Sequence, residues 1–285
     1  MHCFFRLRKG DEMYFSQAHI IFIIFSIFLF IVGTLICYKY NFPTDKVIKT
    51  CFFLALFSEI SKIFMTMQIV PVVETVVENG ALVYKNTGEF APYIRSEFLP
   101  LHLCSLQIIF LFLAIVVKNT KWEKRILSFI YCTALIGGIL AIFLSTIVSE
   151  YNNEVEFLTS IRAWIFYLYH VMIMVIAMVI ARDKKIDIRF EDIKWSYIFL
   201  FFLDIASLYL NSIFTVPLYN NGMLMGITHV SNYFSSYQNP LNIQMTNKNA
   251  YLIYMCIRFV GIVILITLLY LPLLKRNKKR YKKNN

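Results

Sequence analysis

The sequence predicts an all-α protein, a bundle of seven transmembrane helices that forms one domain over residues 1–285. Three observations support this fold class. Hydrophobic residues make up 59% of the 285 residues, and the mean hydropathy is +0.63. Charged residues make up only 16%, whereas soluble domains contain about 25%. Apolar stretches of about 20 residues, the length that crosses a bilayer as a helix, recur along the chain.

The polar gaps between these stretches hold most of the charge. The predicted spans cover about 18–38, 47–69, 98–117, 126–148, 163–181, 195–216 and 251–274. Three basic residues precede the first span, as in a signal peptide, but its apolar core is long. The sequence GTLICYKY that follows lacks a small-residue cleavage site, so we expect a retained helix. The longest gap, 217–250, is rich in Asn and Ser.

The distribution of Lys and Arg predicts the orientation. With seven spans, the side that holds the N-terminus and the 70–97, 149–162 and 217–250 loops carries 7 of these residues, and the other side carries 19. Positive residues concentrate on the cytoplasmic side of a membrane protein. We therefore expect a multi-pass protein of the cell membrane with its N-terminus outside and its C-terminus in the cytoplasm.

The basic tail, residues 275–285, is predicted to contact anionic lipids of the inner leaflet rather than nucleic acid. No nucleotide-binding loop, zinc-protease motif, serine-hydrolase motif or dinucleotide fingerprint is present. The six cysteines are scattered and lack metal-ligand spacing. We expect membrane lipids as partners, and neither a cofactor nor a metal. The sequence gives no indication of oligomeric state.

Ionisable and polar residues inside the spans are costly and usually face the bundle interior or a wet cavity. With the predicted orientation, almost all of them fall between the midplane and the outer surface, which indicates a shared site. Each residue taken alone is better explained by packing, and Glu59 and Lys62 can neutralise each other at i,i+3. The set comprises His19, Glu59, Lys62, His102, Cys104, Gln107, His170, Asp204, Asn211 and Arg258.

Cys104 is the candidate nucleophile. Pro100 suits the first turn of a helix, so a span that begins near Leu99 places Cys104 in the second turn, where the helix dipole favours a thiolate. His102 then points about 200° away from Cys104 around the helix axis. His170, on another span, is the easier base, and His102 can orient a substrate or pair with Glu59. A thiolate beside a histidine can accept an acyl group as a thioester.

The fourth span carries a row of small residues at every fourth position. Thr133, Gly137, Ala141 and Ser145 form this row. Small residues at this spacing let a neighbouring helix approach closely. We expect helix packing there rather than chemistry.

Several motifs resemble the YwaF-like integral membrane proteins of bacteria, which are related to the animal transmembrane-164 family. The stretches FSQAHIIFIIF, FLPLHLCSL, IRAWIFYLYHV, SNYF and YLPLL carry this resemblance over nearly the whole chain. PLHLCS is the most specific of them. The resemblance assigns functional positions to His19, Glu59, His102, Cys104, His170, Asn211, Asn232 and Tyr233.

The animal relatives are regarded as phospholipid acyltransferases with a cysteine centre, so the resemblance implies a lipid acyltransferase with Cys104 as nucleophile and His170 or His102 as base. An alternative hypothesis is a transporter or a protein that binds a small molecule. Its polar cavity would be lined by His19, Glu59, His102, Asp204 and Arg258. A structural subunit of a larger complex is a third hypothesis.

Overall fold

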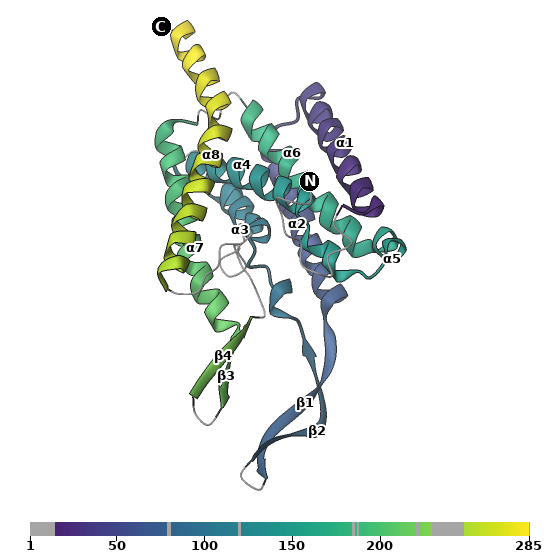
Figure 1. Ribbon diagram of the computed structural model, residues 1–285. Coiled ribbons are helices and arrows are strands. Elements are labelled where there is room, and N and C mark those ends of the chain that lie inside the picture. Colours follow the sequence, from purple (N-terminus) through teal and green to yellow (C-terminus); the bar gives the residue numbers. More distant parts are fainter. Residues whose placement is uncertain are drawn as a thin grey trace.

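The computed structural model describes residues 15–78, 81–118, 121–183, 186, 188–220, 223–229 and 248–284 (Figure 1). A helix occurs at each of the seven predicted spans, and one further helix, α5, has only six residues. The helices are α1 (Gln17–Lys39), α2 (Thr44–Thr66), α3 (Leu103–Val116), α4 (Lys121–Phe143), α5 (Glu154–Thr159), α6 (Ile161–Arg182), α7 (Phe190–Ile213) and α8 (Lys248–Asn284). Two 3₁₀ turns, η1 (Ser96–Phe98) and η2 (Thr146–Glu150), lie between them.

Five helices are long and apolar enough to cross a membrane: α1, α4, α6, α7 and α8. The 23-residue α2 also has sufficient length, but it carries five charged residues between Asp45 and Lys62. The 14-residue α3 is apolar but shorter than a full span. The last helix continues beyond the predicted end of its span and includes most of the basic tail.

Helices α4 and α6 form the centre of the bundle and are the most buried of the long apolar helices. Their close approach depends on Gly138, because a Cβ atom at this position would lie 2.3 Å from Cγ of Met174. Helix α1 packs against α6, where the rings of Phe22 and Tyr167 are stacked with their centroids 4.5 Å apart. The core therefore consists of α4 and α6 surrounded by the other helices.

A buried network of hydroxyl groups joins α4, α7 and α8. The hydroxyl oxygen of Tyr270 lies 2.8 Å from that of Ser128 and 3.0 Å from that of Ser196. Tyr270 also lies 2.5 Å from the carbonyl oxygen of Ser128, to which it donates. Ser128 and Ser196 belong to the first halves of α4 and α7. Polar groups therefore also occur in the half of the bundle opposite to the one in which the sequence analysis placed almost all polar residues of the spans.

The end of the bundle that holds the α1–α2 connection is fixed by polar contacts between helices. Arg182 at the end of α6 donates to the carbonyl oxygens of Cys37 and Phe42, at 2.5 and 2.9 Å. Lys118, after α3, forms an ion pair with Asp45 at the start of α2, with 2.7 Å between nitrogen and oxygen. Partial burial lowers the pKa of Lys118, but the hydrogen bond and charge of Asp45 and the charge of Glu123 outweigh it, so the pKa is raised overall.

Two antiparallel hairpins correct the all-α prediction. Strands β1 (Gln68–Glu78) and β2 (Ala81–Tyr93) pair within the predicted 70–97 loop, and β3 (Thr215–Asn220) pairs with β4 (Met223–His229) at the start of the predicted 217–250 loop. Both hairpins extend from the same end of the helical bundle, and the C-terminal end of α8 lies at the other end (Figure 1). Two predicted loops of one side therefore lie at the same end of the molecule.

Candidate functional site

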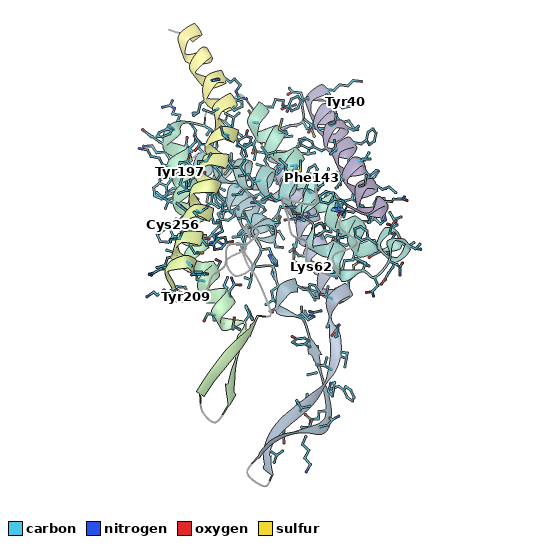
Figure 2. All side chains as sticks on the ribbon, viewed as in Figure 1. Tyr40, Lys62, Phe143, Tyr197, Tyr209 and Cys256 are labelled. Carbon is cyan, nitrogen blue, oxygen red and sulfur yellow. The ribbon has the colours of Figure 1, made fainter. Side chains whose placement is uncertain are left out.

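Side chains of α2, α3 and α6 meet around the first turn of α3. We call this group the Cys104 cluster, and it comprises Glu59, Lys62, Cys104, Ser105 and Tyr169. Figure 2 shows Lys62 near the end of the bundle from which β1–β2 extends. The cluster thus brings together predicted site residues from two spans, with α6 as the third wall.

The start of α3 differs from the prediction. The helix begins at Leu103, and His102 is its N-cap residue with extended backbone angles, φ −73° and ψ 151°. The predicted separation of 200° between His102 and Cys104 is therefore wrong, because it assumed that both residues are helical. Cys104 is the second residue of the helix, closer to its positive end than predicted. The N–H groups of a first helical turn have no partner within the helix and stabilise negative charge.

The thiol of Cys104 faces α4. Its sulfur lies 3.9 Å from the carbonyl oxygen of Gly137, to which it donates, and a Cβ atom at Gly137 would lie 3.4 Å from the sulfur. One turn farther along α3, Nε2 of Gln107 donates to the hydroxyl of Thr133 at 2.6 Å. Thr133 and Gly137 belong to the predicted row of small residues, so the close helix approach predicted there is confirmed, with α3 as the partner.

Tyr169 connects α6 to the nucleophile candidate. Its hydroxyl donates to the backbone carbonyl of Cys104 at 2.5 Å. Sequence reasoning did not select Tyr169, although it directly precedes His170 in a quoted motif. A tyrosine in an aromatic-rich span gives no sequence signal that separates a hydrogen-bonding role from packing.

Glu59 is held by two partners. The hydroxyl of Ser105 donates to Oε1 of Glu59 at 2.8 Å, and Lys62 forms an ion pair with Oε2. The neutralisation at i,i+3 that the sequence suggested is confirmed. The same pair also acts electrostatically on Cys104, so its charges belong to the surroundings of the thiol.

His170 is buried one residue after Tyr169. Its Nδ1 lies 2.7 Å from the carbonyl oxygen of Phe166. Because a carbonyl only accepts, this contact assigns the proton to Nδ1 and leaves the lone pair of Nε2 to accept one. A Cβ atom at Gly138 would lie 3.1 Å from the carbonyl oxygen of His170, so Cys104 and His170 approach adjacent glycines of α4. Lys62 and His102 lie close enough to His170 to interact with it electrostatically.

The remaining predicted residues lie in other contacts. His19 is fully buried and joins α1 to α4, since its Nε2 lies 3.2 Å from the carbonyl oxygen of Ile142. Asp204 of α7 forms an ion pair with Arg258 of α8. Asn211 is buried near the end of α7, and its carbonyl accepts from Thr215 at 2.5 Å.

Asn232 and Tyr233 lie outside the described residues. Within the described ranges, no group of three or more His, Cys, Asp or Glu side chains has the arrangement of a metal site. The side chains described above provide a thiol, an imidazole and a paired carboxylate.

A helical bundle with five helices able to cross a membrane, and with a polar cluster enclosed by apolar helices, defines an integral membrane protein. The model of the TMEM164 family matches residues 14–271, which is most of the chain. The chain belongs to the TMEM164 family. No curated protein and no solved structure matches it significantly.

Proposed function

We propose that the protein is a lipid acyltransferase of the cell membrane that carries the acyl group as a thioester on Cys104. The observation that supports this proposal best is the position of Cys104. Its thiol lies in the first turn of α3, inside the Cys104 cluster and against Gly137 of α4, and the backbone of His170 lies against the adjacent Gly138. Membership of the TMEM164 family is consistent with this proposal.

We further infer that all seven long helices cross the membrane, with the hairpins outside. The charges of α2 lie mainly near its two ends, at 45–49 and 59–62. A 14-residue helix is about 21 Å long, shorter than the apolar thickness of about 30 Å. The segment from Arg95 to His102 supplies the remaining length of the α3 span. The basic end of α8 then reaches the anionic inner leaflet.

In the first half-reaction, Nε2 of His170 accepts the proton of the Cys104 thiol. The thiolate attacks the ester carbonyl of a donor lipid, a C–S bond forms, and the ester C–O bond breaks. The leaving lipid alkoxide takes the proton from His170 and departs as a lysolipid. N–H groups of the first turn of α3, which have no partner within the helix, stabilise the oxyanion of the intermediate.

In the second half-reaction, His170 accepts the proton of an acceptor lipid's hydroxyl. The resulting oxygen attacks the thioester carbonyl, a C–O bond forms, and the C–S bond breaks. The proton then returns to the Cys104 sulfur. Tyr169 holds the start of α3 in place during both steps through its bond to the Cys104 carbonyl.

A labelling experiment tests the proposal. Membranes that contain the full chain are incubated with a phospholipid bearing an alkyne on its acyl chain, and hydroxylamine-labile label on the protein is measured. We expect label on the wild type, none on Cys104→Ala, and full label on Cys256→Ala, because Cys256 is exposed on α8. Absence of labile label from the folded wild-type protein would exclude the thioester.

The alternative, a transporter with one polar cavity, has less support. His19 lies in the contact between α1 and α4, and Asp204 and Arg258 pair between α7 and α8. Glu59 lies with α2, α3 and α6. Residues that the hypothesis placed in one cavity thus belong to three separate contacts.

A further inference from the structure

A pocket of about 490 Å³ lies at the hairpin end of the bundle. It is bordered by the end of α2, the segment that leaves β2, the turn η2 and the start of α6. The side chains that matter for its chemistry are Thr66, Arg95, Phe98, Glu150 and Arg162. Sequence reasoning did not select any of these residues.

Two guanidinium groups gather around one ring in this pocket. The guanidinium carbon of Arg162 lies 4.4 Å from the centroid of Phe98, and that of Arg95 lies 5.8 Å from it. Glu150 forms an ion pair with Arg162 through both of its carboxylate oxygens. The charged side chains of the lining therefore carry one net positive charge, which matches the single negative charge of a phosphodiester.

The pocket lies directly outward from the Cys104 cluster. Thr66 is one turn beyond Lys62 on α2, and its hydroxyl donates to the Lys62 carbonyl at 2.8 Å. Arg162 precedes Tyr169 by seven residues on α6, which corresponds to about 10 Å along the helix. A glycerophospholipid can cover this distance, with its phosphate in the pocket and its ester bonds deeper in the bundle.

We propose that Arg95 and Arg162 bind the phosphate of a glycerophospholipid in this pocket. This inference rests on the proposed function, since it names the residues that would hold the phosphate of that site's substrate. Guanidinium groups form charge-assisted, often bidentate hydrogen bonds to phosphate oxygens. Glu150 competes with the phosphate for Arg162 and so tunes the affinity of the pocket.

The test measures binding rather than turnover. The full chain is purified in an uncharged detergent and titrated with a lysophosphatidylglycerol that carries a fluorophore on its acyl chain. The matching fluorescent monoacylglycerol lacks the phosphate. We expect Arg95→Gln and Arg162→Gln each to weaken binding of the phospholipid about tenfold, and not to change binding of the monoacylglycerol. Arg125→Gln is the control. Arg125 stacks between Trp122 of α4 and Trp195 of α7, and neither helix contributes to the described lining of the pocket.

Glu150→Gln separates binding from stability. It breaks the same ion pair as Arg162→Gln, so damage to the fold would weaken binding in both variants. We expect Glu150→Gln to bind the phospholipid more tightly instead. Equal affinity for the two lipids, normal binding by both arginine variants, or weaker binding by Glu150→Gln would overturn the proposal.

Two further arms identify the source of the phosphate and separate the two proposals. Inorganic phosphate at the concentration of the lipid should not displace it, and displacement would assign the pocket to a free anion. Cys104→Ala should bind the phospholipid normally. If the arginine variants bind the phospholipid more weakly but no thioester forms on Cys104, the proposed acyl transfer is wrong and the phosphate pocket is supported. If a thioester forms but the arginine variants bind the phospholipid normally, only the proposal for the pocket is wrong.

Discussion

At the residue scale, two adjacent glycines of α4 position the candidate site. Gly137 faces the sulfur of Cys104, and Gly138 faces Met174 and the backbone of His170. A Cβ atom at Gly138 would collide with Met174 of α6, whereas one at Gly137 would just contact the sulfur of Cys104 on α3. The two glycines therefore determine how closely the thiol of Cys104 and the backbone of His170 approach α4.

We predict that Gly138→Ala destabilises the bundle by about 1–3 kcal/mol, as overpacking of a core does. The added Cβ would lie 2.3 Å from Cγ of Met174 and 3.1 Å from the carbonyl oxygen of His170, so the helices must move. Thermal unfolding of the purified protein measures the effect. Gly261→Ala is the matched control, because nothing lies within 4 Å of a Cβ there. Equal melting temperatures for the two variants would contradict the prediction.

The sequence identified Cys104 and Glu59 but not Tyr169 or Ser105. Cys104 was selected through its place near the start of a span and in the PLHLCS motif. Glutamate is rare inside membrane spans, so its presence alone is informative. Tyrosine and serine are common there, and their roles depend on which backbone or side-chain group they face. Ser105 is identified only by its bond to Glu59, which lies 46 residues away in the chain.

At the scale of elements, the sequence analysis predicted the helices but missed the hairpins. A span requires only a sufficient length of apolar sequence, which is a local property. The hairpin β1–β2 depends on pairing across strands, such as Val76 with Val83, and its register shifts between Pro71 and Val73. The Val-rich stretch QIVPVVETVVE was an available signal, because β-branched residues favour strands.

The exact start of α3 was also not predictable. Pro100 suits both a helix and the turn that precedes one, and Leu99 to His102 form a turn here. The predicted helix start was four residues too early, so the prediction put Cys104 in the second turn, whereas it lies in the first turn. Since the positive end of the helix dipole acts over about one turn, this shift matters for the chemistry of the thiol.

The contact between α7 and α8 depends on the Asp204–Arg258 ion pair, whose side chains are only 15% and 9% exposed. We predict that Asp204→Asn or Arg258→Met alone costs about 3–5 kcal/mol, because each leaves a buried charge without its partner. The double variant should cost much less than the sum. Denaturant unfolding of the four proteins gives the coupling energy, and additive effects would show that the pair does not stabilise the contact.

At the scale of the whole molecule, the two ends of the bundle differ in character. One end carries both hairpins, the arginine pocket and, just inside it, the Cys104 cluster. The other end carries Arg182, Lys118 and the start of α4, where Arg125 lies 4.6 Å from the ring of Trp122. Tryptophan and basic residues together are typical of a cytoplasmic membrane interface.

The alternation of seven predicted spans placed the 70–97 and 217–250 loops on one side, and both hairpins do lie at one end of the bundle. This alternation could not show that the ends also differ in shape, since hairpins and pocket arise from contacts between distant segments. Nor did the distribution of charge reveal the hydroxyl network of Ser128, Ser196 and Tyr270, because serine and tyrosine carry no charge. The distribution of charge gives a prediction of which end is cytoplasmic, whereas packing determines what each end presents.

Limited proteolysis of right-side-out membrane vesicles tests the inferred orientation. Lys85 is exposed on β2, in the hairpin at the predicted outer end, so external trypsin should cleave there. An epitope tag added after the basic tail should stay protected until the vesicles are opened, because the inferred orientation puts the tail on the inner side. In Lys85→Gln the corresponding fragment should disappear, which assigns the cleavage to the hairpin. Loss of the tag in sealed vesicles, with the hairpin intact, would mean that the orientation is reversed. Cleavage of the hairpin together with loss of the tag in sealed vesicles would place the hairpin and the C-terminus on the same side of the membrane. That result would exclude the seven-span arrangement.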